Sequence, residues 1–73
     1  MRVVVVGATG NVGTSVLQSL EPEAQVEEIV AVARRAPARQ FARTRFAQAD
    51  IVVDDLVPIV RGADAVVHLA WLI

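Results

Sequence analysis

The stretch VVVVGATGNVG, residues 3–13, decides how the rest of the chain is organised. A short run of β-branched apolar residues is typical of a strand that is buried on both faces of a parallel sheet. From Asn11 the pattern becomes helical, and the predicted apolar side of that helix consists of Val12, Val16, Leu17 and Leu20. A strand that enters a helix through a glycine-rich turn is the arrangement that binds the phosphates of a dinucleotide.

The glycines of this turn have separate predicted roles. Gly7 allows a sharp turn at the end of the strand, Gly10 lets the backbone approach a pyrophosphate, and Gly13 lets the helix pack tightly. The first amides of a helix have no acceptor within it and lie at the positive end of its dipole, so they can bind an anion. The predicted binding groups are the amides of Asn11 and Val12 and, unless it only holds the turn, the hydroxyl of Thr9. The alternative is an ordinary strand–helix turn without a ligand.

The composition excludes several classes of site. The chain of 73 residues is short enough for one domain at most, and its net charge of −1 argues against a nucleic-acid-binding surface. Without cysteine it has no disulfide or thiolate–metal site, and without lysine it has no NTP-binding loop of the Walker type. No apolar run is long enough to span a membrane. We expect a cytoplasmic protein with no nucleic-acid partner, no membrane partner and no metal site.

The remaining sequence continues the alternation of strands and helices. Further strands are predicted over residues 28–33, 43–49 and 64–70, and a second helix over residues 54–61. Phe46 is the predicted inward residue of the third strand, and Phe41 ahead of it is expected to pack on the core. Asp54 or Asp55 can cap the second helix, and Gly62 is placed to end it. The fourth strand, like the first two, is an apolar run of the buried type.

These elements predict an α/β fold of the Rossmann type. The expected sheet is parallel, with four strands in the order 3-2-1-4 and helices on both faces, and it is a partial version of the fold. In this order the chain reverses direction across the sheet between the first and fourth strands, so a crevice opens at their carboxyl ends. Residues 7–13 form one predicted lip of the crevice, and residues 69–71 form the other.

The end of the second strand is expected to select the cofactor. In a dinucleotide-binding fold an acidic residue at this place binds the ribose hydroxyls and repels a 2′-phosphate. Here the place holds Arg34, followed by Arg35. Guanidinium groups offer paired planar donors to a phosphate, so the sequence favours NADP over NAD. The alternative for either arginine is a side chain that points to solvent or pairs with a surface glutamate.

The sequence resembles the N-terminal part of the NAD(P)-dependent epimerase/dehydratase family, within the extended or atypical short-chain dehydrogenases/reductases. Four segments carry the resemblance in family order: VVVVGATGNVG, VAVARR, QADI and GADAVVHLAW. The resemblance implies that Asp50 and Ile51 flank the adenine ring, with Asp50 accepting from its amino group. It also implies that Leu69, Ala70 and Trp71 pass beside the ribose and nicotinamide. Trp71 stands where the family more often has a small residue.

The family's usual catalytic pair is missing from these residues. Such enzymes act through a tyrosine and a lysine in a Tyr-x-x-x-Lys arrangement, and the chain contains neither residue. We expect His68 to be structural, and we expect residues 1–73 to be the N-terminal part of a larger NAD(P)-binding domain, with its catalytic and substrate-binding residues elsewhere.

Two functions remain open from the sequence. The first is an oxidoreductase or nucleotide-sugar epimerase/dehydratase that uses NADP(H). The second is a non-catalytic NADP-binding sensor or scaffold. A fourth strand without a further neighbour would leave an open sheet edge, so we also expect a homo-oligomer.

Overall fold

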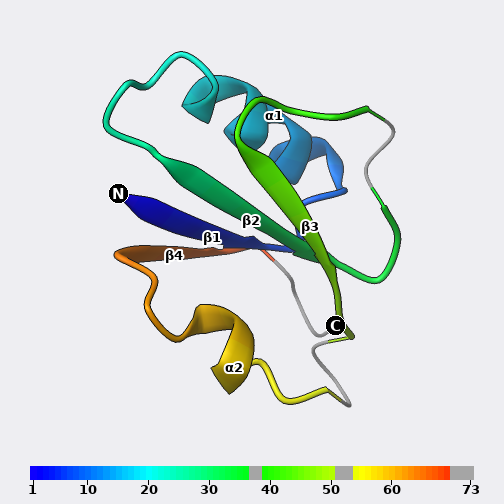
Figure 1. Cartoon of the computed structure of the whole chain (residues 1–73). Coiled ribbons are helices and arrows are strands. Elements are labelled where there is room, and N and C mark those ends of the chain that lie inside the picture. The colour runs from blue at the N-terminus through cyan, green and yellow to red at the C-terminus, as the bar shows by residue number, and fades with distance from the viewer. Residues whose placement is uncertain (37–38, 51–53, 70–73) are drawn as a thin grey trace.

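A computed structural model describes residues 1–36, 39–50 and 54–69, and its elements alternate as predicted. In chain order the elements are β1 (Arg2–Val6), α1 (Asn11–Leu20), β2 (Glu28–Ala33), β3 (Thr44–Gln48), α2 (Val57–Val60) and β4 (Ala65–His68). All three strand pairs are parallel, and the sheet has the order β3-β2-β1-β4 (Figure 1). The α/β fold, the parallel pairing and the strand order expected from the sequence are therefore confirmed.

The two helices lie on opposite faces of the sheet, and the strands supply apolar side chains to both (Figure 1). Val3 and Val5 of β1 belong to a buried cluster that includes Leu17 of α1. Val4 and Val6 belong to the cluster on the other face, against which Ile59 of α2 packs. Because side chains alternate between the faces of a strand, a strand covered on both faces must be apolar at successive positions. The valine run is therefore a central strand, as predicted.

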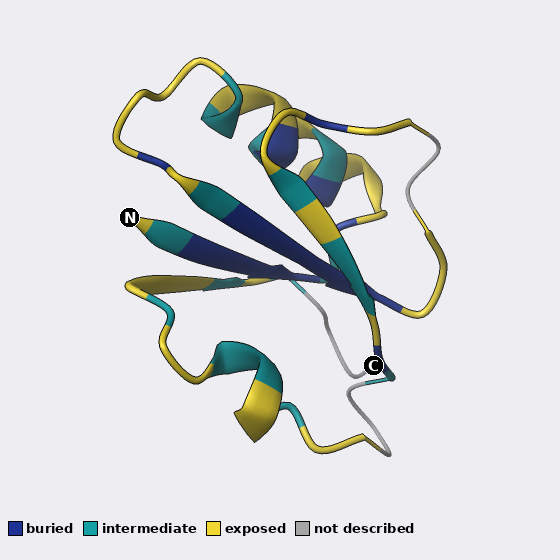
Figure 2. Ribbon diagram, viewed as in Figure 1, coloured by how far each residue is buried: buried dark blue, intermediate teal, exposed yellow. Residues whose placement is uncertain are grey.

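β4 has the apolar sequence of a buried strand but lies at the open sheet edge that was expected after a fourth strand without a further neighbour. Three of its four residues are exposed and only Val67 is half-buried, whereas β2 is buried from Ile29 to Ala33 (Figure 2). In the described part of the chain, β4 pairs with β1 on one side and has no strand on its other side. An apolar run at a sheet edge keeps its strand conformation but loses the neighbour that would bury it. His68, expected to be structural, is one of the exposed residues.

Helix α2 is shorter than predicted. It is a single turn, Val57–Val60, with Pro58 in that turn and no fully buried residue, whereas the sequence predicted residues 54–61. Leu56 occupies the N-cap position, and the Asp55 carboxylate accepts a hydrogen bond from the Val57 amide at 3.0 Å. Gly62 follows the helix with a positive φ of 84°, so its predicted role in ending the helix is confirmed.

Of two predicted core positions in α1 and β3, that of Val12 is wrong and that of Phe46 is intermediate. Val12 is 63% exposed, because the inward position of the first turn of α1 belongs to Gly13, which is buried against the backbone of the preceding turn. Phe46 of β3 is only half-buried. Phe41, which precedes β3, is 6% exposed and joins the cluster beneath α1, as predicted.

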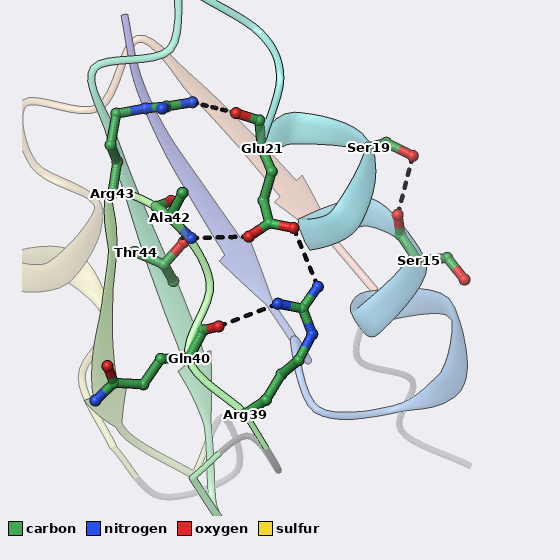
Figure 3. A network of polar contacts seen from close by, with 8 residues as sticks. All are labelled: Ser15, Ser19, Glu21, Arg39, Gln40, Ala42, Arg43 and Thr44. Carbon is green, nitrogen blue, oxygen red and sulfur yellow. Dashed lines mark hydrogen bonds and ion pairs between the residues drawn. The ribbon is translucent and has the colours of Figure 1, made fainter.

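A polar network joins the end of α1 to the segment before β3 (Figure 3). The Glu21 carboxylate accepts from the Arg39 guanidinium at 3.0 Å and from the Ala42 amide at 2.9 Å. These two hydrogen bonds, with that from Arg39 the larger cause, lower the pKa of Glu21 below its ordinary value of 4.5. The Arg43 guanidinium donates to the Glu21 carbonyl at 2.6 Å and to the Val26 carbonyl at 2.9 Å. The network fixes the far end of the connection that leaves β2.

Candidate functional site

The turn after β1 is held against the end of β2. The carbonyl of Val32 accepts hydrogen bonds from the amides of both Gly7, at 2.8 Å, and Ala8, at 3.2 Å. Gly7 has a φ of 86°, a conformation that residues with a side chain rarely adopt. Ala8 is fully buried. The predicted need for glycine at position 7 is confirmed, and the turn is built by backbone groups.

Gly13 is required by packing. A Cβ atom at this position would lie 2.5 Å from the Gly7 carbonyl oxygen and 2.6 Å from the carbonyl carbon and oxygen of Ala8. These are backbone atoms, so no side chain could move aside. The backbone of α1 at Gly13 therefore packs directly against the backbone of Gly7 and Ala8, and the predicted role of Gly13 in tight packing is confirmed.

Gly10 has neither of these reasons to be a glycine. Its backbone is extended, with φ −76° and ψ 176°, which any residue can adopt. A Cβ built on Gly10 meets no atom of the described residues within 4 Å. The space in front of Gly10 is thus open and lies at the N-terminus of a ten-residue helix. A missing side chain that the fold does not require is the feature expected where a ligand approaches the backbone.

The amides at this end of α1 are available to an acceptor. The first backbone hydrogen bond of the helix runs from the Thr14 amide to the Gly10 carbonyl, at 2.9 Å. Among the described residues, the amides of Asn11 and Val12 find no acceptor, and both residues are exposed. The first turn of α1 has no acidic residue, so its positive end keeps its charge. Thr9 is also exposed, and its hydroxyl makes no hydrogen bond with the described chain.

The other strands end beside this turn. Val6 of β1 pairs with Val32 of β2, and Ala33 pairs with Gln48 of β3, so the carboxyl ends of the three strands share one edge of the sheet. The structure thereby brings the glycine turn to the same edge as the residues that follow β2 and β3. These are Arg34 and Arg35 after β2, and Asp50 after β3.

Arg34 and Arg35 are both exposed at the end of β2. The carbonyl of Arg34 accepts a hydrogen bond from the Gln48 side chain at 3.2 Å. Within the described ranges neither guanidinium pairs with a carboxylate, in contrast to Arg39, which binds Glu21 at 3.0 Å. Neither guanidinium is therefore engaged by a carboxylate of the described chain, and Arg34 lines a hollow between the ends of β2 and β3.

An open hollow of about 440 Å³ lies between the ends of β2 and β3. Its lining residues are Arg34, Gln48, Ala49, Asp50 and Asp54. Asp50 is half-buried, and its backbone is held by Asp54 on both sides. The Asp50 amide donates to the Asp54 carboxylate at 2.6 Å, and the Asp54 amide donates back to the Asp50 carbonyl at 2.8 Å. Ile51, the second residue expected at the adenine, lies outside the described residues.

Leu69 marks the opposite lip of the predicted crevice. Its amide donates to the carbonyl of Val6 at 2.8 Å, and its half-buried side chain packs against the cluster beneath α1. Leu69 is thus next to the end of β1, as expected. Ala70 and Trp71, the other two residues expected on this lip, lie outside the described residues.

Sequence reasoning missed two residues of the site. From the sequence, Gln48 was predicted only as a strand residue and Asp54 only as a helix cap. In the structure both line the hollow, and their side chains make hydrogen bonds with the backbone of Arg34 and Asp50. Their roles depend on which groups the turn after β3 brings within hydrogen-bonding distance, and spacing alone does not reveal this. No three potential metal-ligating side chains gather anywhere in the described ranges. The described helices are also too short to cross a bilayer.

The sequence matches the model of the NAD dependent epimerase/dehydratase family over residues 3–73. Among solved structures, it is 27% identical to the oxidoreductase ylbE from Lactococcus lactis, with a TM-score of 0.83 over 99% of this chain and 33% of that one. It is 26% identical to UDP-glucuronic acid 4-epimerase from Bacillus cereus, solved in complex with NAD, with a TM-score of 0.80 over 100% of this chain and 28% of the epimerase.

A third similar structure is that of MoeE5 in complex with UDP-glucuronic acid and NAD. The identity is 29%, and the TM-score is 0.81 over 99% of this chain and 23% of MoeE5. The chain thus spans a third or less of the length of these relatives. No curated protein sequence matches it.

Proposed function

The chain belongs to the NAD dependent epimerase/dehydratase family, and we propose that it is the dinucleotide-binding portion of an oxidoreductase or nucleotide-sugar epimerase/dehydratase. The observation that carries this proposal is the open face of Gly10, where the fold has no need of a glycine. A pyrophosphate in that space would meet the free amides of Asn11 and Val12 at the positive end of α1. The nicotinamide ring, when bound, supplies hydride exchange with the substrate.

The other site residues are proposed to hold the rest of the cofactor. Asp50, at the hollow beyond β3, accepts from the amino group of the adenine, and Ile51 lies against the ring. Leu69, Ala70 and Trp71 follow β4 and pass beside the ribose and nicotinamide. The position of Leu69 supports this arrangement, because its amide is bonded to the carbonyl of Val6, the residue directly before the glycine turn.

We propose that NADP is preferred over NAD. The support is the pair Arg34 and Arg35, which are exposed at the end of β2 and have no carboxylate partner in the described part of the chain. A 2′-phosphate at this place would receive charge-assisted hydrogen bonds, whereas the uncharged ribose of NAD would not. The two similar structures described above that were solved with NAD come from proteins only 26% and 29% identical to this chain, so the cofactor preference needs its own test.

We propose a nucleotide sugar as the substrate. The epimerase from Bacillus cereus is named for UDP-glucuronic acid, and MoeE5 was solved with it. The chain has no tyrosine and no lysine, so the general acid/base of the reaction would come from residues beyond these 73. A non-catalytic sensor or scaffold gains no support from the family match or from these relatives.

A titration of the full-length protein with NADPH tests the phosphate site. Gly10→Ala adds a methyl group that meets no described atom within 4 Å but replaces a favoured N-cap residue, so we expect only a small fall in melting temperature while NADPH affinity falls at least about tenfold. Val12→Ala is the control, because it shortens an exposed side chain and keeps the amide. Unchanged NADPH binding by Gly10→Ala would refute the phosphate site.

The same titration with NADH tests the cofactor preference. We expect the wild type to bind NADPH more tightly than NADH, and Arg34→Asp to reverse the order because a carboxylate repels the 2′-phosphate. Arg45→Asp makes the same change of charge at an exposed residue of β3 that does not line the hollow, and we expect a smaller change from it. If Arg34→Asp leaves the preference intact, Arg34 does not select the cofactor.

A further inference from the structure

Asp54 makes hydrogen bonds with both backbone polar groups of Asp50, its amide and its carbonyl. Its carboxylate Oδ2 accepts from the Asp50 amide at 2.6 Å, and its own amide donates to the Asp50 carbonyl at 2.8 Å. One residue thus satisfies both backbone polar groups of the other. The first of these hydrogen bonds is short and charge-assisted, which makes it stronger than a bond between neutral groups.

This pair of hydrogen bonds lies in the hollow that also contains Arg34. Both Asp50 and Asp54 line the hollow, and Asp50 follows Ala49, whose amide extends the pairing of β2 and β3 through a bond of 3.0 Å to Ala33. Asp50 is therefore held by the sheet on its N-terminal side and by Asp54 at its own peptide groups. With both backbone groups held, the direction in which the Asp50 side chain leaves the chain is fixed.

Asp54 is exposed, so its two hydrogen bonds with Asp50 are not needed to satisfy buried polar groups of Asp54. An exposed hydrogen bond contributes little to stability, since water would replace it at small cost. The same bond has a larger effect on a site, because a binding group that is held in its productive direction loses less freedom when the ligand arrives.

We propose that Asp54 is a positioning residue for recognition of the adenine base, acting through the backbone of Asp50. This inference rests on the proposed function, in which the Asp50 carboxylate accepts from the adenine amino group. Asp54 does not touch the base. It determines whether Asp50 meets the amino group of the purine, and so whether the site distinguishes adenine from a purine that lacks that group.

Binding of NAD⁺ and of nicotinamide hypoxanthine dinucleotide to the full-length protein tests the proposal. The two ligands differ only at the base, where hypoxanthine has a carbonyl oxygen at C6 and a proton on N1 in place of the amino group and the unprotonated N1 of adenine. Neither carries a 2′-phosphate, so Arg34 contributes equally to both. By calorimetry we expect the wild type to bind NAD⁺ about tenfold more tightly, a difference of about 1.4 kcal/mol. We expect Asp54→Ala to bind the two ligands within about twofold of each other.

Two further variants separate positioning from general effects. Asp54→Asn keeps an oxygen that can accept from the Asp50 amide, and we expect it to retain most of the preference for NAD⁺. Asp55→Ala is the matched control, since it removes the same charge one residue away and breaks a bond to the Val57 amide instead. If Asp54→Ala does not fold, Asp54→Glu, which displaces the acceptor, gives the same test.

The outcomes distinguish this inference from the function on which it rests. An undiminished preference for NAD⁺ in Asp54→Ala, or an equal loss in Asp55→Ala, would overturn the positioning role alone. NAD⁺ binding by a wild type that does not discriminate between the bases would overturn both the role of Asp54 and the adenine contact of Asp50. No binding of NAD⁺ or NADP⁺ to the wild type would overturn the proposed function itself.

Discussion

Strands β2 and β4 flank β1 on its two sides, and both are parallel to it, but they differ sharply in burial. β2 lies between β1 and β3 and is buried from Ile29 to Ala33, while β4 pairs only with β1 in the described chain and exposes three of its four residues. Both are apolar runs of similar composition. The comparison teaches that an apolar run determines the strand, whereas the neighbours on both edges determine its burial.

The largest expected effect separates the two strands directly. Ile29→Ala removes a fully buried side chain and leaves a cavity, so we expect the free energy of unfolding to fall by about 2–5 kcal/mol. Val66→Ala in β4 truncates a side chain that is 50% exposed, and we expect a change within about 0.5 kcal/mol. Chemical denaturation of both variants measures the difference. Equal losses would mean that β4 is buried in solution, by a further segment or by a second copy of the chain.

The next largest effect compares two glycines, Gly13 in α1 and Gly62 in the turn before β4. Gly13→Ala places a Cβ within 2.6 Å of backbone atoms, so we expect a loss of about 3 kcal/mol, at the upper end for overpacking. Gly62, before β4, has a φ of 84° and a flexible Arg2 side chain as its nearest neighbour at 3.3 Å. Gly62→Ala should therefore lose only about 1–2 kcal/mol, the cost of a left-handed alanine. A larger loss at Gly62 than at Gly13 would contradict the contrast.

The smallest expected effect concerns the polar network around Glu21, which joins the end of α1 to the segment before β3. The folded state lowers the pKa of Glu21, chiefly through its hydrogen bond with Arg39, so folding favours the ionised carboxylate. This stabilisation is fully present above the ordinary pKa of 4.5 and is lost as the pH falls through the lowered value. We expect Glu21→Gln to melt below the wild type at pH 7 and to approach it on acidification.

Glu23→Gln is the control for that measurement, because the Glu23 side chain makes no hydrogen bond with the described residues. A melting difference between wild type and Glu21→Gln that does not depend on pH would show that the ionised form of Glu21 has no special role in the network.

The sequence allowed much of the fold to be predicted, because its strongest signals are local. The valine run, the bounds of α1 and β2, and the separate roles of Gly7 and Gly13 follow from periodicity and backbone geometry, and the structure confirms them. The exposure of β4 does not follow from its apolar composition, because burial depends on neighbouring strands; it follows from the open sheet edge that was expected beside it. The length of α2 was wrong because Pro58 and a short apolar stretch leave its bounds to tertiary packing.

The candidate site divides in the same way. The glycine turn could be predicted because its chemistry is that of the backbone, and the arginines after β2 because their distance from the turn is set by the fold. The hydrogen bonds that the Gln48 and Asp54 side chains make with neighbouring backbone groups could not be predicted, because they depend on how the ends of β2 and β3 meet. Local rules therefore predict the proposed position of the ligand, and tertiary contacts determine how firmly the residues around that position are held.

The carbonyl of Val32 connects two parts of the proposed site. It receives the amides of Gly7 and Ala8 from one segment, and only one residue separates it from Arg34 on its own segment. The glycine turn and Arg34, which are proposed to hold neighbouring parts of one ligand, are thus both positioned by the segment around the Val32 carbonyl. A change in length on either side of that atom would displace the glycine turn relative to Arg34, whereas the exchange of a side chain would leave their spacing unchanged.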